Sequence, residues 1–298
     1  MNPFLQKLGY AATDRVVILH ADDIGASHSP LAAYQDLMEA GILSSAATMV
    51  PCGWFPATAA YCRTHADNPN LDMGVHLTLT SEWDVMRWGP VARRDRASGL
   101  VDDEGYFHRQ AAPVQEKADL DAVAGELRAQ IRQALAAGVD ATHVDTHMFT
   151  LGHARLLPVY LAVAKEFGLP AFLPNLKEEH LRDMDFDEES AAILAGLVAQ
   201  VNGASFPLFD HVHVMSLSPG YAGDRLEEIK TVLAELPAGL SNIILHPCID
   251  SPETRAIGPD WRCRVADHAL FTSDGLRHAL ADAGVQVIGF RALWDAMA

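Results

Sequence analysis

The stretch "VVILHADDIG" (16–25) joins an apolar run directly to two aspartates and a glycine. Short runs rich in Val and Ile are typical of buried β-strands. Two adjacent carboxylates at the end of such a strand repel each other, and burying them without partners costs free energy. In parallel α/β folds, however, the carboxyl ends of strands form the open face that carries reactive groups. Asp22 and Asp23 therefore predict both a parallel sheet and a site at its edge.

Runs of the same kind recur along the chain and alternate with segments of helical spacing. The expected strands are 16–22, 44–50, 72–79, 142–149, 170–174, 211–217, 242–248 and 285–290. The expected helices are 29–40, 120–137, 154–167, 188–200, 224–235 and 273–283. This alternation is the pattern of βα units around a parallel sheet, and it predicts an α/β barrel of seven or eight strands.

Composition narrows the class of protein. The 298 residues are 49% apolar and show no linker, so we expect one catalytic barrel domain over 1–298. A net charge of −17 argues against nucleic acid and anionic membrane surfaces as partners. No apolar run approaches the length of a membrane span, and the first residues lack a signal-peptide pattern, so a cytoplasmic location is expected. The four cysteines form no close pair and are expected to be reduced thiols.

A long connection at about 81–118 interrupts the alternation. It has no clean period, and it holds Trp83 and Trp88 among Gly, Pro, Asp and Arg. Connections of this length without secondary structure are usually functional or disordered, and the aromatic residues argue against disorder. Trp83 and Trp88 could form a sugar-binding wall, or the loop could simply pack on the barrel through its own aromatic side chains.

The motif "THVDTH" (142–147) places three polar residues on one face of a strand. His143, Asp145 and His147 alternate in sequence, so their side chains point the same way. Burying them unpaired would cost several kcal/mol, so each requires a hydrogen-bond partner or a metal. We interpret His143, which lies deeper, as part of a core network, Asp145 as a supporting or substrate-binding residue, and His147 as a metal ligand.

Three strand ends together supply a possible metal site. His76 in "GVHLTLT" (74–80) would be weak evidence alone, because single buried histidines are usually hydrogen-bonded core residues. With Asp23 and His147 it gives two imidazoles and one carboxylate, the ligand set of a catalytic metal centre with open positions. A cation bound by Asp23 would offset the charge repulsion between the two aspartates, and Asp22 would then be free to act as a general base. A helix cap is the alternative role for these aspartates.

The remaining histidines at strand positions are assigned by their place along the strand. His246 in "LHPCID" (245–250) stands at the predicted open face and is a candidate general acid. His20 shares the face of Asp22 and is expected to support it, whereas His211 and His213 begin their strand and are expected to be structural. No nucleotide-binding, zincin or serine-nucleophile motif is present.

The ordered motifs "HADDIG", "GVHLTLT", "THVDTH" and "LHPCID" resemble the YdjC-like carbohydrate deacetylases, also called the ChbG/HpnK family. The resemblance implies a distorted (β/α) barrel of the glycoside hydrolase/deacetylase type, and metal-dependent removal of acetyl groups from N-acetylated sugars such as chitooligosaccharides. It also implies that Asp23, His76 and His147 bind the metal, that Asp22 is the general base and that His246 is the proton donor. The family is associated with magnesium or zinc, and two histidines with one carboxylate favour zinc or another borderline metal over magnesium.

The sequence departs from the family where typical members read HxDSHxHxH. Here Met148, Phe149, Thr150 and Leu151 follow His147, and Ile24 replaces the usual phenylalanine. The metal ligands are kept, so the departure concerns the acetylated sugar that is bound. Two other functions stay open: a glycoside hydrolase, for which Asp145 is the convenient second acid, and a non-catalytic sugar-binding protein. A homo-oligomer is also compatible with the sequence.

Overall fold

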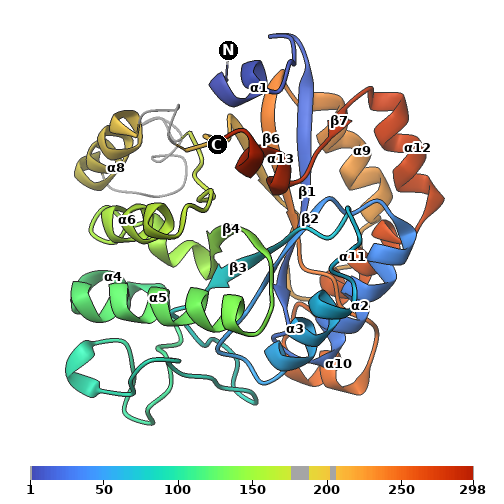
Figure 1. Cartoon of the computed structure of the whole chain (residues 1–298). Helices are drawn as coiled ribbons and strands as arrows, with labels where there is room; N and C mark the ends of the chain where they lie inside the picture. Colours follow the sequence, from blue (N-terminus) through green and yellow to red (C-terminus); the bar gives the residue numbers. More distant parts are fainter. Residues whose placement is uncertain (1, 176–187, 202–205, 298) are drawn as a thin grey trace.

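A computed structural model describes residues 2–175, 188–201 and 206–297. Its centre is a parallel sheet of seven strands in the order β4-β3-β2-β1-β6-β5, with β7 also paired to β1 (Figure 1). The strands are β1 (Arg15–Ile24), β2 (Ser45–Thr48), β3 (Met73–Leu77), β4 (Ala141–Thr146), β5 (His211–Val214), β6 (Gly239–Leu245) and β7 (Gln286–Val287). The predicted parallel α/β class is confirmed.

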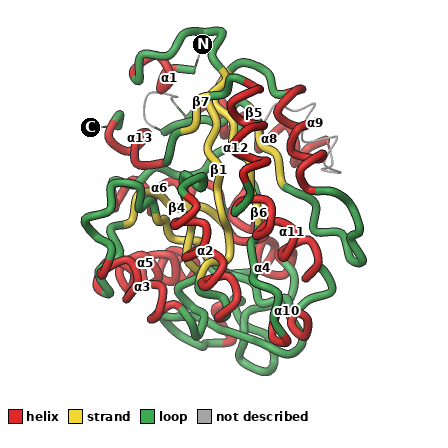
Figure 2. The backbone as a smooth tube through the Cα atoms, turned by 90° about the vertical axis from the view of Figure 1, so that its right-hand side faces the viewer, coloured by secondary structure: helices red, strands yellow, loops and turns green. Residues whose placement is uncertain are grey.

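Helices follow most of the strands and surround the sheet, as the two views show (Figures 1 and 2). They are α1 (Pro3–Lys7), α2 (His28–Ala40), α3 (Phe55–Thr64), α4 (Ala111–Lys117), α5 (Leu120–Ala136), α6 (Leu157–Phe167), α8 (Glu188–Gln200), α9 (Arg225–Glu235), α10 (Pro252–Ile257), α11 (Trp261–Phe271), α12 (Asp274–Ala283) and α13 (Phe290–Asp295). Within the described residues, no helix has the length and apolar character that a membrane span requires.

Among the described residues, the strands do not close into a complete barrel. Residues 170–174, predicted as a strand, make only isolated bridges, from Ala171 to Val144 and from Pro174 to Phe209. The reason lies in "PAFLP", because the prolines at both ends of this segment lack the N–H that a continuous ladder needs. The predicted strand 285–290 is also shorter, since α13 begins at Phe290.

The two faces of the sheet contact different cores. Along β1, Val17 and Leu19 belong to the large core beneath the helices, whereas Val16 and Ile18 belong to a smaller inner core. The fully or nearly buried members of this inner core also include Phe4, Phe172, Phe209, Leu240, Phe290 and Leu293. Because strand side chains alternate, His20 and Asp22 continue the face of Val16 and Ile18. The inner core therefore lies directly beneath the candidate site.

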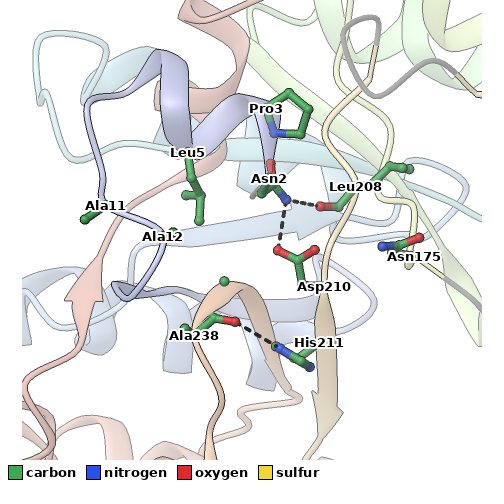
Figure 3. Close-up of a pocket in the computed structure, with 11 residues that line it drawn as sticks. Asn2, Pro3, Leu5, Ala11, Ala12, Asn175, Leu208, Asp210, His211 and Ala238 are labelled. Carbon is green, nitrogen blue, oxygen red and sulfur yellow. Dashed lines mark hydrogen bonds between the residues drawn. The ribbon is translucent and has the colours of Figure 1, made fainter.

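Helices α1 and α13 cover the end of the sheet where β1 begins (Figure 1). Lys7 Nζ donates a hydrogen bond to the carbonyl of Ala296, 3.0 Å away. Next to α1, Asn2 Nδ2 donates to the carbonyl of Leu208 at 2.7 Å and to the carboxylate of Asp210 at 3.1 Å. The two contacts of Asn2 border a cavity of about 620 Å³ at this end of the molecule (Figure 3).

The connection 81–118 has more regular structure than its sequence predicts. It contains the 3₁₀ turn η1 (Arg96–Ser98) and helix α4, and an antiparallel bridge joins Val101 to Phe107. Elements this short complete too few turns to produce a visible hydrophobic period. The four cysteines lie within the described ranges, where they are buried and free, as predicted.

Candidate active site

A break in strand regularity directs both aspartates toward the same cavity. The register between β1 and β2 shifts between Ala21 and Ile24, and Asp23 has a positive φ of 64°. In a regular strand, neighbouring side chains would point to opposite faces. The irregularity instead lets Asp22 and Asp23 both line one cavity. A left-handed backbone at a residue other than glycine is uncommon and costs conformational energy, which functional sites often retain.

Asp23, His76 and His147 converge on one point. Asp23 Oδ1 lies 3.5 Å from His76 Nε2 and 3.3 Å from His147 Nδ1, and the two nitrogens are 3.2 Å apart. All three residues are buried, and one ligand atom from each falls within 4.8 Å of the others. Asp23 Oδ1 is buried without a hydrogen-bond partner. An unpaired buried carboxylate oxygen facing two imidazole nitrogens fits a divalent cation.

Arg264 in α11 occupies the other oxygen of Asp23. Its Nη1 donates to Asp23 Oδ2 at 2.7 Å, and its Nε donates to Asp260 at 2.8 Å. Burial alone would raise the pKa of Asp23, but the neighbouring His147, His76 and Arg264 hold it well below its usual range. Asp23 is therefore ionised, with one oxygen fixed by the guanidinium and the other left for a ligand.

Asp145 supports the site from below through two histidines. His76 Nδ1 lies 2.8 Å from Asp145 Oδ1, and His20 Nε2 lies 2.9 Å from Asp145 Oδ2. Against the opposing effect of burial, Asp145 and Asp22 raise the pKa of His76, so its Nε2 would give up a proton on binding a metal while the proton on Nδ1 stays donated to Asp145. Burial alone would raise the pKa of Asp145, but the two histidines lower it. Asp145 thus orients His76, and both its oxygens are engaged.

His20 also faces the second aspartate. Its Nε2 lies 3.1 Å from Asp22 Oδ1, in addition to its hydrogen bond with Asp145. Burial alone would lower the pKa of His20, but the two carboxylates raise it to about 9. His20 is therefore a buried imidazolium at neutral pH, and it holds one oxygen of Asp22. The other oxygen, Oδ2, lies 3.7 Å from His246 Nε2.

The raised pKa of His20 predicts a stability that falls with increasing pH. Protonated His20 is favoured in the folded state, so it adds to the free energy of unfolding. This added stability is complete below pH 6.5 and is lost as pH rises from 6.5 to about 9. We expect metal-free protein to lose on the order of 2–3 kcal/mol of unfolding free energy from this source. His20→Gln should flatten the decline, measured by urea unfolding at several pH values in EDTA.

His278→Gln, which removes an exposed histidine of α12, is the control and should keep the wild-type slope. Against the opposing effect of burial, Glu82 and Asp23 also raise the pKa of His147 to about 9. Part of the decline in stability with pH should therefore remain in His20→Gln. Identical slopes in His20→Gln and wild type would contradict the assignment of His20 as an imidazolium.

Glu82 completes the site and was missed from the sequence. Its Oε2 lies 2.9 Å from His147 Nε2, so His147 is held by a carboxylate on the side opposite to Asp23. Burial alone would raise the pKa of Glu82, but His147 lowers it. The available signal was its position, because Glu82 is the first charged residue after the strand that contains His76. Glu82 also connects the segment 81–118 to the site.

Glu82→Gln is expected to weaken metal affinity about 10- to 100-fold, because the amide cannot orient and polarise His147 as the carboxylate does. The measurement is the dissociation constant for Zn²⁺, obtained by competition with a chromogenic chelator. Glu104→Gln, which changes an exposed carboxylate in the same segment, is the matched control. An unchanged affinity in Glu82→Gln would show that this contact does not support the metal.

His246 stands immediately after β6 and lines the same cavity as Asp23, His76 and His147. Its backbone N–H donates to Asp267 Oδ2 at 3.0 Å, and Asp267 pairs with Arg225 at 2.7 Å. This buried ion pair joins α11 and α9 and fixes the end of β6. Burial lowers the pKa of His246, with partial opposition from Asp23 and Asp22. The imidazole is therefore neutral at neutral pH and can accept a proton.

The two tryptophans have different environments. Trp83 lines the cavity, and Arg264 lies over its ring at 5.5 Å. Trp88 is buried, and its Nε1 donates to the carbonyl of Thr80 at 2.8 Å. The predicted sugar-binding wall therefore cannot include Trp88, which packs behind Trp83 with ring centroids 5.3 Å apart. The apolar ring of Trp88 is better buried than exposed once its N–H has a backbone acceptor.

His143 lies below the site, as its position in the strand predicts. Its ring stacks on Phe290 at 3.8 Å and contacts His20 edge-on at 5.1 Å. A Cβ on Gly74 would lie 2.4 Å from this ring, so glycine is required on the neighbouring strand. Burial lowers the pKa of His143 well below its usual range, and it is a neutral core residue.

The cavity in front of these groups has a volume of about 710 Å³. It is lined by both aspartates, by His76, His147 and His246, and by Arg264. At its inner end it shares Asn175, Asp210 and His211 with the cavity beside α1. A space of this size is within the range of small-molecule sites.

Fold and site together define a parallel α/β protein with a buried centre of carboxylates and imidazoles at the carboxyl ends of its strands. The chain belongs to the YdjC-like protein family, whose profile matches residues 16–282. The resemblance inferred from the motifs is thereby confirmed.

Two relatives that are named as carbohydrate deacetylases match over nearly their full length. A carbohydrate deacetylase of Thermus thermophilus is 32% identical over 278 residues, which cover 93% of this chain and 94% of the relative. A carbohydrate deacetylase of Thermoanaerobacter pseudethanolicus is 24% identical, with 94% and 99% covered. A crystal structure from Enterococcus faecalis, described as a candidate cellobiose-phosphate cleavage protein, has a TM-score of 0.74 at 23% identity, with 94% and 99% covered. This structure shows the same fold.

Proposed function

We propose that this protein is a metal-dependent hydrolase that removes the acetyl group from an N-acetylated sugar or oligosaccharide, of the chitooligosaccharide kind, and releases acetate. The observation that carries the proposal is the convergence of Asp23, His76 and His147 beside a second carboxylate, Asp22. The names of the relatives support it. Glu82 and Trp83 also support a single catalytic domain in which the segment 81–118 is part of the site.

Asp23 Oδ1, His76 Nε2 and His147 Nδ1 are the atoms that would hold the cation. Two imidazoles with one carboxylate favour zinc over magnesium, which prefers oxygen ligands. A divalent ion bound here supplies a Lewis acid that polarises the amide carbonyl and makes water a stronger acid. Arg264 keeps Asp23 ionised and limits it to one free oxygen.

Asp22 and His246 carry out the proton transfers of the reaction. Asp22, whose Oδ1 faces His20, has Oδ2 directed toward His246 at 3.7 Å. Asp22 takes the proton from the attacking water, and His246 delivers a proton to the departing amine nitrogen. Because His246 is neutral in the substrate-free protein, the proton that it delivers is the one that Asp22 has taken from the water and passes to the His246 imidazole. The products are acetate and a free amino sugar.

A glycoside hydrolase would need a second free carboxyl group across the substrate from Asp22. Asp145 is the candidate, but His76 and His20 occupy its two oxygens at 2.8 and 2.9 Å. The contacts of Asp145 therefore favour amide hydrolysis over cleavage of a glycosidic bond.

The test is an acetate-release screen over N-acetylated mono- and disaccharides with Zn²⁺, Mg²⁺, Mn²⁺ and Co²⁺. We expect release with at least one pair of sugar and metal, loss of release in EDTA, and recovery when the metal is restored. Release that persists in EDTA would contradict the metal site. No release from any sugar would overturn the proposed activity, and it would favour a sugar-binding role.

A further inference from the structure

One side of the site cavity is apolar. We call it the apolar wall, and it consists of residues from the turn after β4, from residues 172 and 209, and from β5. Its members are Met148, Phe149, Phe172, Phe209, Val212 and Val214. Ile244, next to His20 in the sheet register, joins the wall to the catalytic groups. The wall is thus continuous with the site where the amide bond would lie.

Three members of the wall are open to solvent. Met148 is 60% exposed, Val214 is 51% exposed and Val212 is 37% exposed. Strand β5 pairs only with β6, so its other edge has no ladder neighbour among the described residues. Exposed apolar side chains gathered at a cavity, rather than scattered singly, are typical of a surface that binds an apolar group.

The backbone places two of these residues at some conformational cost. Met148 has φ 53° and ψ 22°, and Phe149 has φ 50° and ψ 27°, so two consecutive residues with side chains are left-handed. A Cβ on Gly152 would lie 2.2 Å from the ring of Phe149, so the ring position requires that glycine. Outliers of this kind persist where the surrounding structure enforces them, often at binding sites.

We propose that the amino-sugar substrate carries an alkyl chain and that this chain lies along the apolar wall. Sugar hydroxyl groups require hydrogen-bond partners, and the six side chains of the wall offer none. An alkyl chain gains free energy when it covers such a surface. The chain is either a longer N-acyl group in place of acetyl or an alkyl group on the anomeric oxygen. The inference rests on the proposed function, because it assumes that an amide is cleaved beside His76 and His147.

The experiment measures release of free amine by metal-loaded protein from two homologous series. One series is glucosamine N-acylated with acetyl, butyryl or hexanoyl groups, and the other is methyl, butyl or octyl N-acetylglucosaminide. In one series kcat/KM should rise by up to about fourfold per added methylene, the factor expected for burying one CH₂. The responding series identifies where the chain is attached.

Valine variants test whether the wall causes this dependence. Val212→Thr adds a hydroxyl at nearly constant volume, and it should lower the ratio of kcat/KM for the longest over the shortest substrate roughly threefold or more. Val287→Thr is the matched control, because Val287 is 39% exposed on the short strand β7 and does not line the cavity. This control should keep the wild-type ratio.

Two outcomes would overturn the inference without affecting the proposed function. The first is amine release that does not depend on chain length in either series. The second is an equal ratio in Val212→Thr and Val287→Thr. Absence of amine release from every compound in both series would instead count against the proposed function itself.

Discussion

Asp22→Asn is expected to lower kcat for acetate release by about 10²- to 10⁴-fold, the usual contribution of a general base. Asparagine keeps the shape of the side chain but cannot accept the proton of the attacking water. Asp22 is not one of the three proposed ligands, so the variant should still bind one equivalent of metal. The two measurements are steady-state acetate release and metal content after dialysis.

Asp250→Asn is the control for this prediction, since Asp250 is a carboxylate paired with Arg255 outside the cavity. It should keep wild-type turnover. Because Asp22 also faces His20 at 3.1 Å, thermal unfolding of Asp22→Asn should be recorded to show that the fold is intact. Full turnover in a folded Asp22→Asn protein would refute its role as the base.

His147→Ala is expected to abolish metal binding and acetate release together. The change removes one of the three converging ligand atoms and leaves Glu82 without its imidazole partner, 2.9 Å away in the native site. Calorimetric titration with Zn²⁺ should show the high-affinity event in wild type and its absence in the variant. This joint loss distinguishes a ligand from Asp22, whose replacement should affect turnover alone.

His278→Ala serves as the control, because it deletes an exposed histidine on α12. It shows whether zinc bound by surface histidines contributes to the measured titration. It should bind metal and release acetate like wild type. Wild-type zinc affinity in His147→Ala would mean that the metal is held elsewhere, and the ligand set would have to be revised.

The helices could be predicted from the sequence where a single apolar face packs on the hydrophobic core. Helix α8 spans Glu188–Gln200 as its period indicates, and α5 ends one residue before the predicted end. Helix α11 escaped prediction because its inward face carries Arg264 and Asp267, which are buried and charged. Charged residues on a buried face erase the hydrophobic period on which such predictions depend.

The candidate site was predictable as a set of strand-end residues but not as a geometry. The predicted strand 142–149 is too long, because β4 ends at Thr146 and His147 begins the turn after it. Alternation along β4 still places His143 and Asp145 on one face, and His76 and Asp23 lie beside His147 as expected for neighbouring strand ends. The left-handed conformation of Asp23 has no local sequence signal. The partners Glu82 and Arg264 come from segments without a period, so only the tertiary structure reveals them.

The pairing of β1 with β6 has a consequence for the order in which the site is assembled. All three proposed metal ligands precede residue 148 in the chain, whereas His246 and Arg264 belong to its final part. The sheet joins these parts by pairing Val16 with Leu240 across most of the sequence, a contact whose closure slows folding. A nascent chain that ends before Gly239 therefore already carries Asp23, His76 and His147, but it lacks the guanidinium that satisfies Asp23. Synthesis of β6 and α11, which bring His246 and Arg264, is therefore needed before the proposed site can be complete.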